Sequence, residues 1–259
     1  MTAMAGMAVL RAEGIRKTYG AIVAVDGVSL TLYDGEMLGL IGPNGSGKST
    51  LFDCCSGLVR PNAGKVRIQG RETTDWSMDR IARDARMVRS FQRTSVFGSM
   101  SVEENVLAAA QLRAEPSVLR SLVPSRMPRA AMCEIAERAM EYLRLVDLER
   151  MKDVPASELS YGQQKLLQFV SAVVPLPRIV LLDEPFAGVN PILMARMSEL
   201  IRKTNREHGT AFLIIEHNVE ALSALCPRIM VLHQGRLLRE GAPSEVLRSD
   251  DVVEAYLGG

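Results

Sequence analysis

The sequence of 259 residues predicts an α/β fold with a mostly parallel core sheet, an N-terminal antiparallel β part and an inserted α-helical subdomain. Short β-rich segments separated by turn residues fill residues 8–41, and helical periodicity replaces them over residues 92–175. Strand and helix patterns then alternate, which favours right-handed crossovers and parallel pairing. We therefore expect one domain over residues 1–259, with an α/β core from 1–91 and 176–259 and a helical insertion over 92–175.

The first strands are predicted from β-rich runs at Val9–Lys17, Ala24–Tyr33 and Met37–Ile41. Asp34-Gly35 lies between the last two runs and is typical of a hairpin turn. The run Met37–Ile41 is apolar throughout rather than alternating, which predicts a strand covered on both faces.

A helical pattern follows at Lys48–Ser56, with Gly57 as its C-terminal stop. A strand at Val66–Ile68 then closes with a turn at Gln69-Gly70. The α/β pattern resumes after residue 177. The elements predicted there are strands at Ile179–Asp183, Ala211–Ile215, Arg228–His233 and Arg236–Glu240, a helix near Ile192–Glu207 and a turn at Gln234-Gly235.

The inserted segment shows helical spacing, for example at Ile135, Ala139, Leu143 and Val146. Within it, residues 112–129 are rich in Arg, Ser and Pro and are the least regular stretch of the chain. We expect this stretch to be a surface excursion, whose role the sequence leaves open.

The composition is that of an ordinary globular protein. Thirty-one Lys and Arg residues balance thirty Asp and Glu residues, which excludes a disordered tail and a globally basic nucleic-acid-binding protein. Four cysteines without C-x-x-C spacing suit reduced thiols in a cytosol rather than disulfides or structural zinc. We find no signal-peptide pattern and no run of about 18 apolar residues, so any membrane partner would be another chain.

Residues 42–49 fit the phosphate-binding pattern G-x-x-x-x-G-K-[ST] without mismatch, between a predicted buried strand and a helix. In such a loop, backbone N–H groups and the positive end of the helix attract phosphate. Lys48 is expected to reach the β- and γ-phosphates, and Ser49 to offer its hydroxyl to Mg²⁺. The alternative is a glycine-rich turn without chemical consequence. The residues assigned here to nucleotide binding are Gly42, Pro43, Asn44, Gly45, Ser46, Gly47, Lys48, Ser49 and Thr50.

An acidic pair follows the apolar run Ile179–Leu182. The pattern places Asp183 and Glu184 at the carboxyl edge of the sheet, beside the phosphate loop. We expect Asp183 to orient Mg²⁺, directly or through water, and Glu184 to act as general base toward the attacking water. Without the lysine of the loop, a solvent-facing strand end would be the simpler interpretation.

The segment Leu159–Gln164 resembles the signature L-S-G-G-Q of ATP-binding cassette (ABC) ATPases, a branch of the P-loop NTPases. Three further residues stand where that family has functional side chains: Tyr19, Gln92 and His217. The resemblance covers essentially the whole chain. It implies a head-to-tail dimer, with each ATP held between the phosphate loop of one chain and Ser160, Gly162 and Gln163 of the other.

The resemblance also implies individual roles. Gln92 would contact Mg²⁺ and the attacking water and sense the membrane partner, His217 would hold the γ-phosphate, and Tyr19 would stack on adenine. Taken alone, each has a simpler interpretation: a solvated glutamine, a structural histidine and a packed tyrosine.

Finer features resemble the ATPase subunits of branched-chain amino-acid importers. They are Tyr161 in the signature, the segment Ala187–Pro191 and the tail Glu254–Gly258. This likeness implies a second ABC ATPase chain, identical or different, membrane permease subunits, a periplasmic or extracellular substrate-binding protein, and a place on the cytoplasmic face of the membrane. The alternatives are urea or amide import, lipopolysaccharide export, or a soluble ABC regulator without a permease; a small-molecule kinase is more remote.

Some residues depart from the family pattern or invite other interpretations. Asn190 replaces an aspartate, and Gln168 and Ser171 replace a glutamate and an arginine of many relatives, so their effects stay open. A stripe of arginines suggests a solvated face rather than a nucleic-acid site, and no nucleic-acid partner is expected. We interpret Cys54 and Cys55 as core packing rather than a redox switch. The stripe comprises Arg80, Arg83, Arg86, Arg89 and Arg93.

Overall fold

The structure is a computed structural model that describes residues 6–89, 96–114 and 129–257. The chain divides into two compact units. The α/β unit comprises the described residues up to 89, residues 178–185 and those from 205 onward, and the helical unit comprises the described parts of 90–177 and 186–204.

The helical unit includes residues 186–204, which the sequence analysis placed with the α/β core. Polar contacts explain this grouping. Arg196 Nη2 lies 2.9 Å from Asp147 Oδ2, and Lys203 Nζ lies 2.8 Å from Glu141 Oε1. The segment 186–204 is therefore tied by ion pairs to the residues of the insertion.

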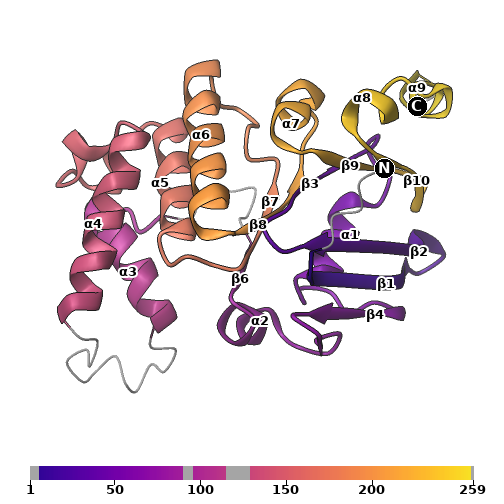
Figure 1. The fold of residues 1–259 in the computed structure, drawn as a ribbon, viewed down its shortest axis with the longest axis horizontal. Helices are drawn as coiled ribbons and strands as arrows, with labels where there is room; N and C mark the ends of the chain where they lie inside the picture. Colours follow the sequence, from indigo (N-terminus) through magenta and orange to yellow (C-terminus); the bar gives the residue numbers. More distant parts are fainter. Residues whose placement is uncertain (1–5, 90–95, 115–128, 258–259) are drawn as a thin grey trace. The chain divides into compact units, whose positions relative to one another are not determined.

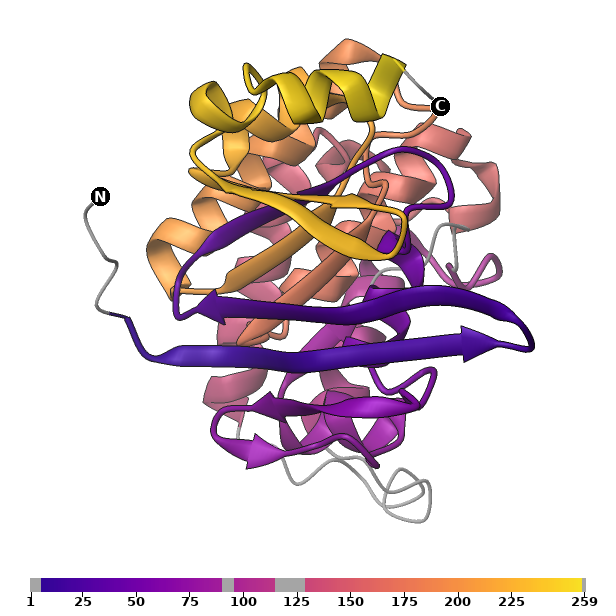
Figure 2. The same cartoon turned by 90° about the vertical axis from the view of Figure 1, so that its right-hand side faces the viewer.

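The N-terminal part of the α/β unit is an antiparallel sheet in the order β2-β1-β4-β5. Its long strands β1 and β2 run side by side in Figure 2 and pair in a register that places Leu10 opposite Leu32 and Ala12 opposite Leu30. These four side chains are buried and alternate with more exposed ones, as a sheet with one covered face requires. The strands are β1 (Ala8–Tyr19), β2 (Ile22–Tyr33), β4 (Ala63–Ile68) and β5 (Arg71–Glu72).

The second sheet has the order β10-β9-β3-β8-β7-β6. All pairs are parallel except β9 with β10, and every residue of β7 and β8 is buried. The mostly parallel core sheet expected from the sequence is confirmed. Its strands are β3 (Met37–Ile41), β6 (Met87–Arg89), β7 (Ile179–Asp183), β8 (Ala211–Ile215), β9 (Arg228–His233) and β10 (Arg236–Gly241).

The prediction of a hairpin at Asp34-Gly35 is wrong. The chain does turn there, with Gly35 at φ 66° and the Glu36 N–H donating to the Tyr33 carbonyl at 3.1 Å. However, β3 pairs with β8 and β9 in the second sheet, so the turn joins two sheets. The reason is burial, because an apolar strand gains more between two parallel neighbours than at the edge of the antiparallel sheet.

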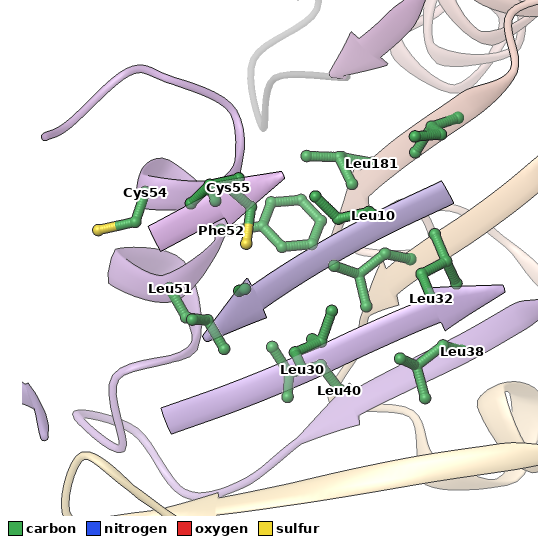
Figure 3. Close-up of a cluster of buried hydrophobic side chains, with 14 of the residues drawn as sticks. Leu10, Leu30, Leu32, Leu38, Leu40, Leu51, Phe52, Cys54, Cys55 and Leu181 are labelled. Carbon is green, nitrogen blue, oxygen red and sulfur yellow. The ribbon is translucent and has the colours of Figure 1, made fainter. Parts of the chain in front are cut away.

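One hydrophobic cluster links both sheets to α1 (Lys48–Cys55). Figure 3 shows Leu51 and Phe52 of α1 gathered with leucines of β1, β2 and β3. The helix that follows the phosphate loop is thus fixed by core packing. The other helices of this unit are α2 (Met78–Asp84), α7 (Val219–Leu225), α8 (Pro243–Val246), α9 (Asp250–Leu257) and the last residues of α6 (Pro191–His208).

In the helical unit, α3 (Val102–Ala114), α4 (Arg129–Leu145) and α5 (Tyr161–Val173) lie side by side (Figure 1). Short 3₁₀ turns at Glu149–Met151 and Ala156–Glu158 connect α4 to α5. Most of the predicted excursion 112–129 lies outside the described residues. Among the helices that are described, none has the length and apolar character needed to cross a bilayer.

The cysteines support the packing interpretation. Cys54 and Cys55 belong to the core cluster, Cys226 is also buried, and Cys133 is exposed. Burial raises the pKa of Cys54 to about 11 and the pKa values of Cys55 and Cys226 to about 12. Near neutral pH these three thiols stay protonated, which makes them poor nucleophiles.

We expect Leu51→Ala to lower the free energy of unfolding by about 2–5 kcal/mol, because it removes a fully buried side chain from the cluster. Leu58→Ala is the matched control, since Leu58 is 49% exposed, and it should change the free energy by about 0.5 kcal/mol or less. Urea unfolding followed by circular dichroism measures both. Equal midpoints for the two variants would contradict the packing described here.

At about pH 8 the folded protein should react rapidly with a thiol reagent at Cys133 only, because a thiol with a pKa of 11 is ionised to roughly one part in a thousand. Urea should release the remaining three thiols, and Cys133→Ser should remove the rapid phase. Rapid modification of Cys54 in the folded protein, identified by peptide mapping, would restore the redox interpretation.

Candidate functional site

Three neighbouring parallel strands of the α/β unit end in polar residues. The order β3-β8-β7 places Leu40 beside Ile215 and Ile215 beside Asp183. The phosphate loop follows β3, Glu216 and His217 follow β8, and the acidic pair closes β7. The sheet therefore gathers the predicted loop, carboxylates and histidine at one edge, where ligands bind in open α/β sheets.

The path of the loop requires glycine at two positions. Gly42 has φ 148°, and a Cβ added to it would lie 2.1 Å from the Leu232 carbonyl oxygen. Gly47 has φ 98°, and its added Cβ would lie 2.4 Å from the Ala24 carbonyl oxygen. Any side chain at either position would collide with backbone, so these glycines fix the route from β3 into α1.

The turn between β9 and β10 braces the loop through backbone atoms. The Gly235 N–H donates to the Ser46 carbonyl at 3.1 Å, and the Asp26 N–H donates to the Gly235 carbonyl at 2.8 Å. The loop also closes on itself, because the Ser46 N–H donates to the Pro43 carbonyl at 3.2 Å. The sequence predicts the turn at Gln234-Gly235 but gives no sign that it supports the loop.

Lys48 fills the inside of the loop. Its Nζ donates to the carbonyl oxygens of Gly42 at 2.7 Å and Pro43 at 2.9 Å, and lies 3.5 Å from Ser46 Oγ. Burial lowers the pKa of Lys48, while the charges of Glu184 and Asp183 act in the opposite direction. The first turn of α1 contains no acidic residue, so its N–H groups and the lysine form a region of positive potential.

Asp183 is held by an arginine that the sequence analysis interpreted differently. Arg89 Nη2 lies 3.4 Å from Asp183 Oδ2, and Arg89 Nη1 lies 2.6 Å from Asp53 Oδ1 and 2.9 Å from Ser56 Oγ. The solvated-face interpretation is wrong for Arg89, whose side chain is 8% exposed, because this residue lies on β6 and not on α2. Burial raises the pKa of Asp183, and Arg89 acts against that rise.

Glu184 and His217 form a direct pair, with Oε1 and Nε2 2.9 Å apart. Glu184 has φ 48°, a backbone conformation that non-glycine residues adopt mainly where the surrounding structure enforces it. The buried carboxylate of Glu216 accepts the N–H groups of His217 at 3.0 Å and Asn218 at 3.3 Å. The sequence analysis did not predict this role of Glu216. The position of Glu216 directly before His217 is the one signal that could have indicated it.

Several other residues predicted to bind nucleotide are more exposed to solvent than Lys48. Tyr19, at the end of β1, is 48% exposed, with Lys17 Nζ 5.2 Å from the centre of its ring. Asn44, Gly45 and Ser49 are exposed, and Thr50 is half-buried. Gln92 lies outside the described residues.

In the helical unit, Ser160 caps α5. Its N–H donates to Gln163 Oε1 at 2.9 Å and its Oγ accepts the Gln163 N–H at 3.4 Å, which is a capping box. A Cβ added to Gly162 would lie 2.4 Å from Leu193 Cδ1, so glycine lets α5 approach α6 closely. Tyr161, in place of the first signature glycine, is 51% exposed.

The segment after the acidic pair is also anchored within the helical unit. Lys165 Nζ donates to the Ala187 carbonyl, and Asn190 Oδ1 accepts the Leu193 N–H at 2.9 Å. Asn190 therefore caps the start of α6, a role that needs an oxygen acceptor and no charge.

A glycine-rich loop between a buried parallel strand and a helix, with a lysine inside it and two carboxylates beside it, defines a P-loop nucleotide-binding protein. Comparison with known proteins narrows this class. Residues 25–187 match the family model described as "ABC transporter", and the chain belongs to this family. It is therefore an ATP-binding ATP hydrolase of the ABC type.

Several relatives cover nearly the whole chain. The high-affinity branched-chain amino acid transport ATP-binding protein LivG of Salmonella typhimurium is 36% identical over 96% of this chain and 97% of its own length. The corresponding protein BraF of Pseudomonas aeruginosa is 34% identical, covering 96% and 98%. The lipopolysaccharide export system ATP-binding protein LptB of Acidithiobacillus ferridurans is 37% identical, covering 96% of both chains.

Solved structures confirm the fold class. An ATP-binding cassette of an ABC transporter in its ADP conformation has a TM-score of 0.81 at 32% identity, covering 98% of this chain and 100% of that one. A dimeric cassette in a post-hydrolysis state, bound to ADP and Pi, has a TM-score of 0.75 at 26% identity, covering 90% and 98%.

Proposed function

We propose that this chain powers an importer for branched-chain amino acids as one half of a head-to-tail ATPase dimer. The observation that best supports the ATPase mechanism is that Lys48, Asp183 and the Glu184–His217 pair lie together at the carboxyl ends of the parallel strands. The cargo is supported by likeness to LivG and BraF and by the local features Tyr161, Ala187–Pro191 and Glu254–Gly258.

Nucleotide binding is assigned to the loop from Gly42 to Thr50. The phosphates replace the loop carbonyls as partners of Lys48 and receive the N–H groups at the start of α1. Tyr19 is exposed, as stacking on adenine requires.

Mg²⁺ is assigned to Ser49 and Asp183, with Gln92 as a further ligand. A hydroxyl and a carboxylate fit the preference of this ion for oxygen ligands, and the exposed Ser49 leaves room for phosphate and water. When bound, the ion neutralises charge on the β- and γ-phosphates. The protein holds its side of the site with the buried carboxylate of Asp183.

Hydrolysis is assigned to Glu184, which takes a proton from the water that attacks the γ-phosphorus. The bond to the bridging oxygen breaks, and ADP and phosphate are released. His217, 2.9 Å from the carboxylate, orients it and contacts the γ-phosphate. General-base help of this kind contributes about 10²–10⁴-fold to the rate.

Closure of the dimer supplies the mechanical step. Ser160, Gly162 and Gln163 of a second chain, identical or different, would meet the γ-phosphate at the N-terminus of α5. The solved relative bound to ADP and Pi is dimeric, which supports the formation of a dimer. A preference of ATP for the closed form of about 10⁴-fold, or about 5.5 kcal/mol, would switch the population almost completely.

The membrane partners follow from the same likeness. We assign the chain to the cytoplasmic face of the membrane, bound to permease subunits that receive cargo from a periplasmic or extracellular binding protein. The transport names of LivG and BraF support this assignment. We expect no nucleic-acid partner.

Lipopolysaccharide export is the second candidate, because two LptB proteins are 37% and 34% identical to this chain. To separate the two, we would capture the tagged chain from mildly solubilised membranes and identify its partners by mass spectrometry. Uptake of labelled leucine would be compared between cells carrying the wild-type chain and cells carrying Lys48→Ala.

Polytopic partners together with a loss of leucine uptake would support the proposal. Polytopic partners with normal leucine uptake would contradict the assignment of branched-chain amino acids as cargo. Urea, amides and lipopolysaccharide would then be tested as cargo. Recovery of soluble partners alone, with Mg·ATP present, would contradict transport and favour a regulator.

Lys48→Ala should weaken ATP binding by at least about 100-fold, because it removes the cation inside the loop. Fluorescent-nucleotide titration measures the affinity. Lys65→Ala, which alters an exposed lysine paired with Glu72, should bind as the wild type does. Unchanged affinity in a folded Lys48→Ala protein would contradict the phosphate-loop assignment.

Glu184→Gln should keep ATP binding, lower hydrolysis by about 10²–10⁴-fold and accumulate the closed dimer with Mg·ATP. Light scattering after size exclusion reports the dimer, with any partner ATPase chain present. Glu220→Gln, which alters an exposed residue in the first turn of α7, serves as control and should hydrolyse normally. A Glu184→Gln protein that stays monomeric would contradict the sandwich model.

A further inference from the structure

We propose that Arg89 is a positioning residue that orients the carboxylate of Asp183 for the metal. The inference rests on the proposed function, because it takes Asp183 as a Mg²⁺ ligand. It adds a residue that lies outside the phosphate loop, the acidic pair and the signature.

The guanidinium of Arg89 connects three elements of the α/β unit. From β6 it reaches Asp183 at the end of β7, with Nη2 3.4 Å from Oδ2. It also reaches α1, with Nη1 2.6 Å from Asp53 Oδ1 and 2.9 Å from Ser56 Oγ. One planar group thus ties the acidic strand end to the helix that carries the phosphate loop.

These contacts are shielded from solvent, which strengthens them. The side chains of Arg89 and Asp183 are 8% and 5% exposed, and Asp53 is 22% exposed. The Arg89 guanidinium also lies 5.4 Å from the centre of the Phe52 ring, against the core. With α1 on one side and β7 on the other, the guanidinium is held in one place and restricts rotation of the Asp183 carboxylate.

The geometry of arginine matters as much as its charge. Two nitrogens of one rigid fork serve Asp53 and Asp183 separately, which the single nitrogen of lysine cannot do from the same position. A positive charge beside Asp183 would, by Coulomb's law alone, weaken the attraction of the carboxylate for a cation. Orientation and competition therefore predict opposite effects when Arg89 is removed.

The test measures how strongly Mg²⁺ and nucleotide binding are coupled. The affinity for the non-hydrolysable analogue AMP-PNP is titrated in saturating Mg²⁺ and in EDTA, and the ratio of the two affinities is the coupling. We expect Arg89→Met to keep the affinity in EDTA and to reduce the ratio by about tenfold, as outer-shell partners of metal ligands do. An unchanged or larger ratio would overturn the proposal.

Two further variants keep the proposal falsifiable where Arg89→Met fails to fold. Arg89→Lys retains the charge but not the fork, and a fully retained ratio would overturn the positioning role. The double variant Asp53→Ala, Ser56→Ala removes both polar anchors on α1 and leaves the pair with Asp183, so it should lower the ratio in the same direction. An unchanged ratio for this double variant in a folded protein would also overturn the proposal.

Arg178→Met is the matched control. Arg178 pairs with Asp34 at 3.1 Å on the surface, beside the start of β7 rather than its end, so the ratio should stay at the wild-type value. Absence of any Mg²⁺ coupling in the wild type would contradict the proposed metal site itself. Normal coupling in the wild type and in all Arg89 variants would contradict only the role of Arg89.

Discussion

Burial of β3, β8 and β7 on both faces is the constraint on which the site depends. Because these strands are parallel and almost wholly covered, their polar continuations all emerge at the same edge of the sheet. The strand order therefore brings the phosphate loop, the acidic pair and His217 together, and the contact between Glu184 and His217 follows from it. Packing of α1 into the core of the α/β unit then fixes where the loop ends.

Each ionisable side chain of this edge has a polar partner before any ligand arrives. Lys48 is satisfied by loop carbonyls, Asp183 by Arg89, and Glu184 by His217. A ligand therefore exchanges existing contacts for new ones, which limits the net gain from each contact but avoids leaving buried charges alone. The arrangement keeps the site in one geometry, which suits a reaction driven by positioning and electrostatics.

Much of this could be predicted from the sequence, because apolar runs and glycine spacing are local signals. The strand at Met37–Ile41 and the helix at Lys48 are examples. The predictions that failed depend on partners distant in sequence. The chain leaves the antiparallel sheet at Asp34-Gly35 because β3 pairs with β8 and β9. The same holds for Arg89, whose carboxylates lie 36 residues before it and 94 after it, and for the support of His217 by Glu216.

The brace from the β9–β10 turn to the phosphate loop consists of backbone atoms alone, between Gly235 and Ser46. Its chemistry is therefore independent of side-chain identity. The turn requires positive φ at Gln234 and Gly235, and little room at Gly235, where an added Cβ would lie 3.0 Å from the Ala24 carbonyl oxygen. Alanine scanning would miss its hydrogen bond and detect only strain. Replacing the Gly235 amide by an ester, which deletes the N–H donor and leaves every side chain in place, is the kind of chemistry that can reveal how such a support acts.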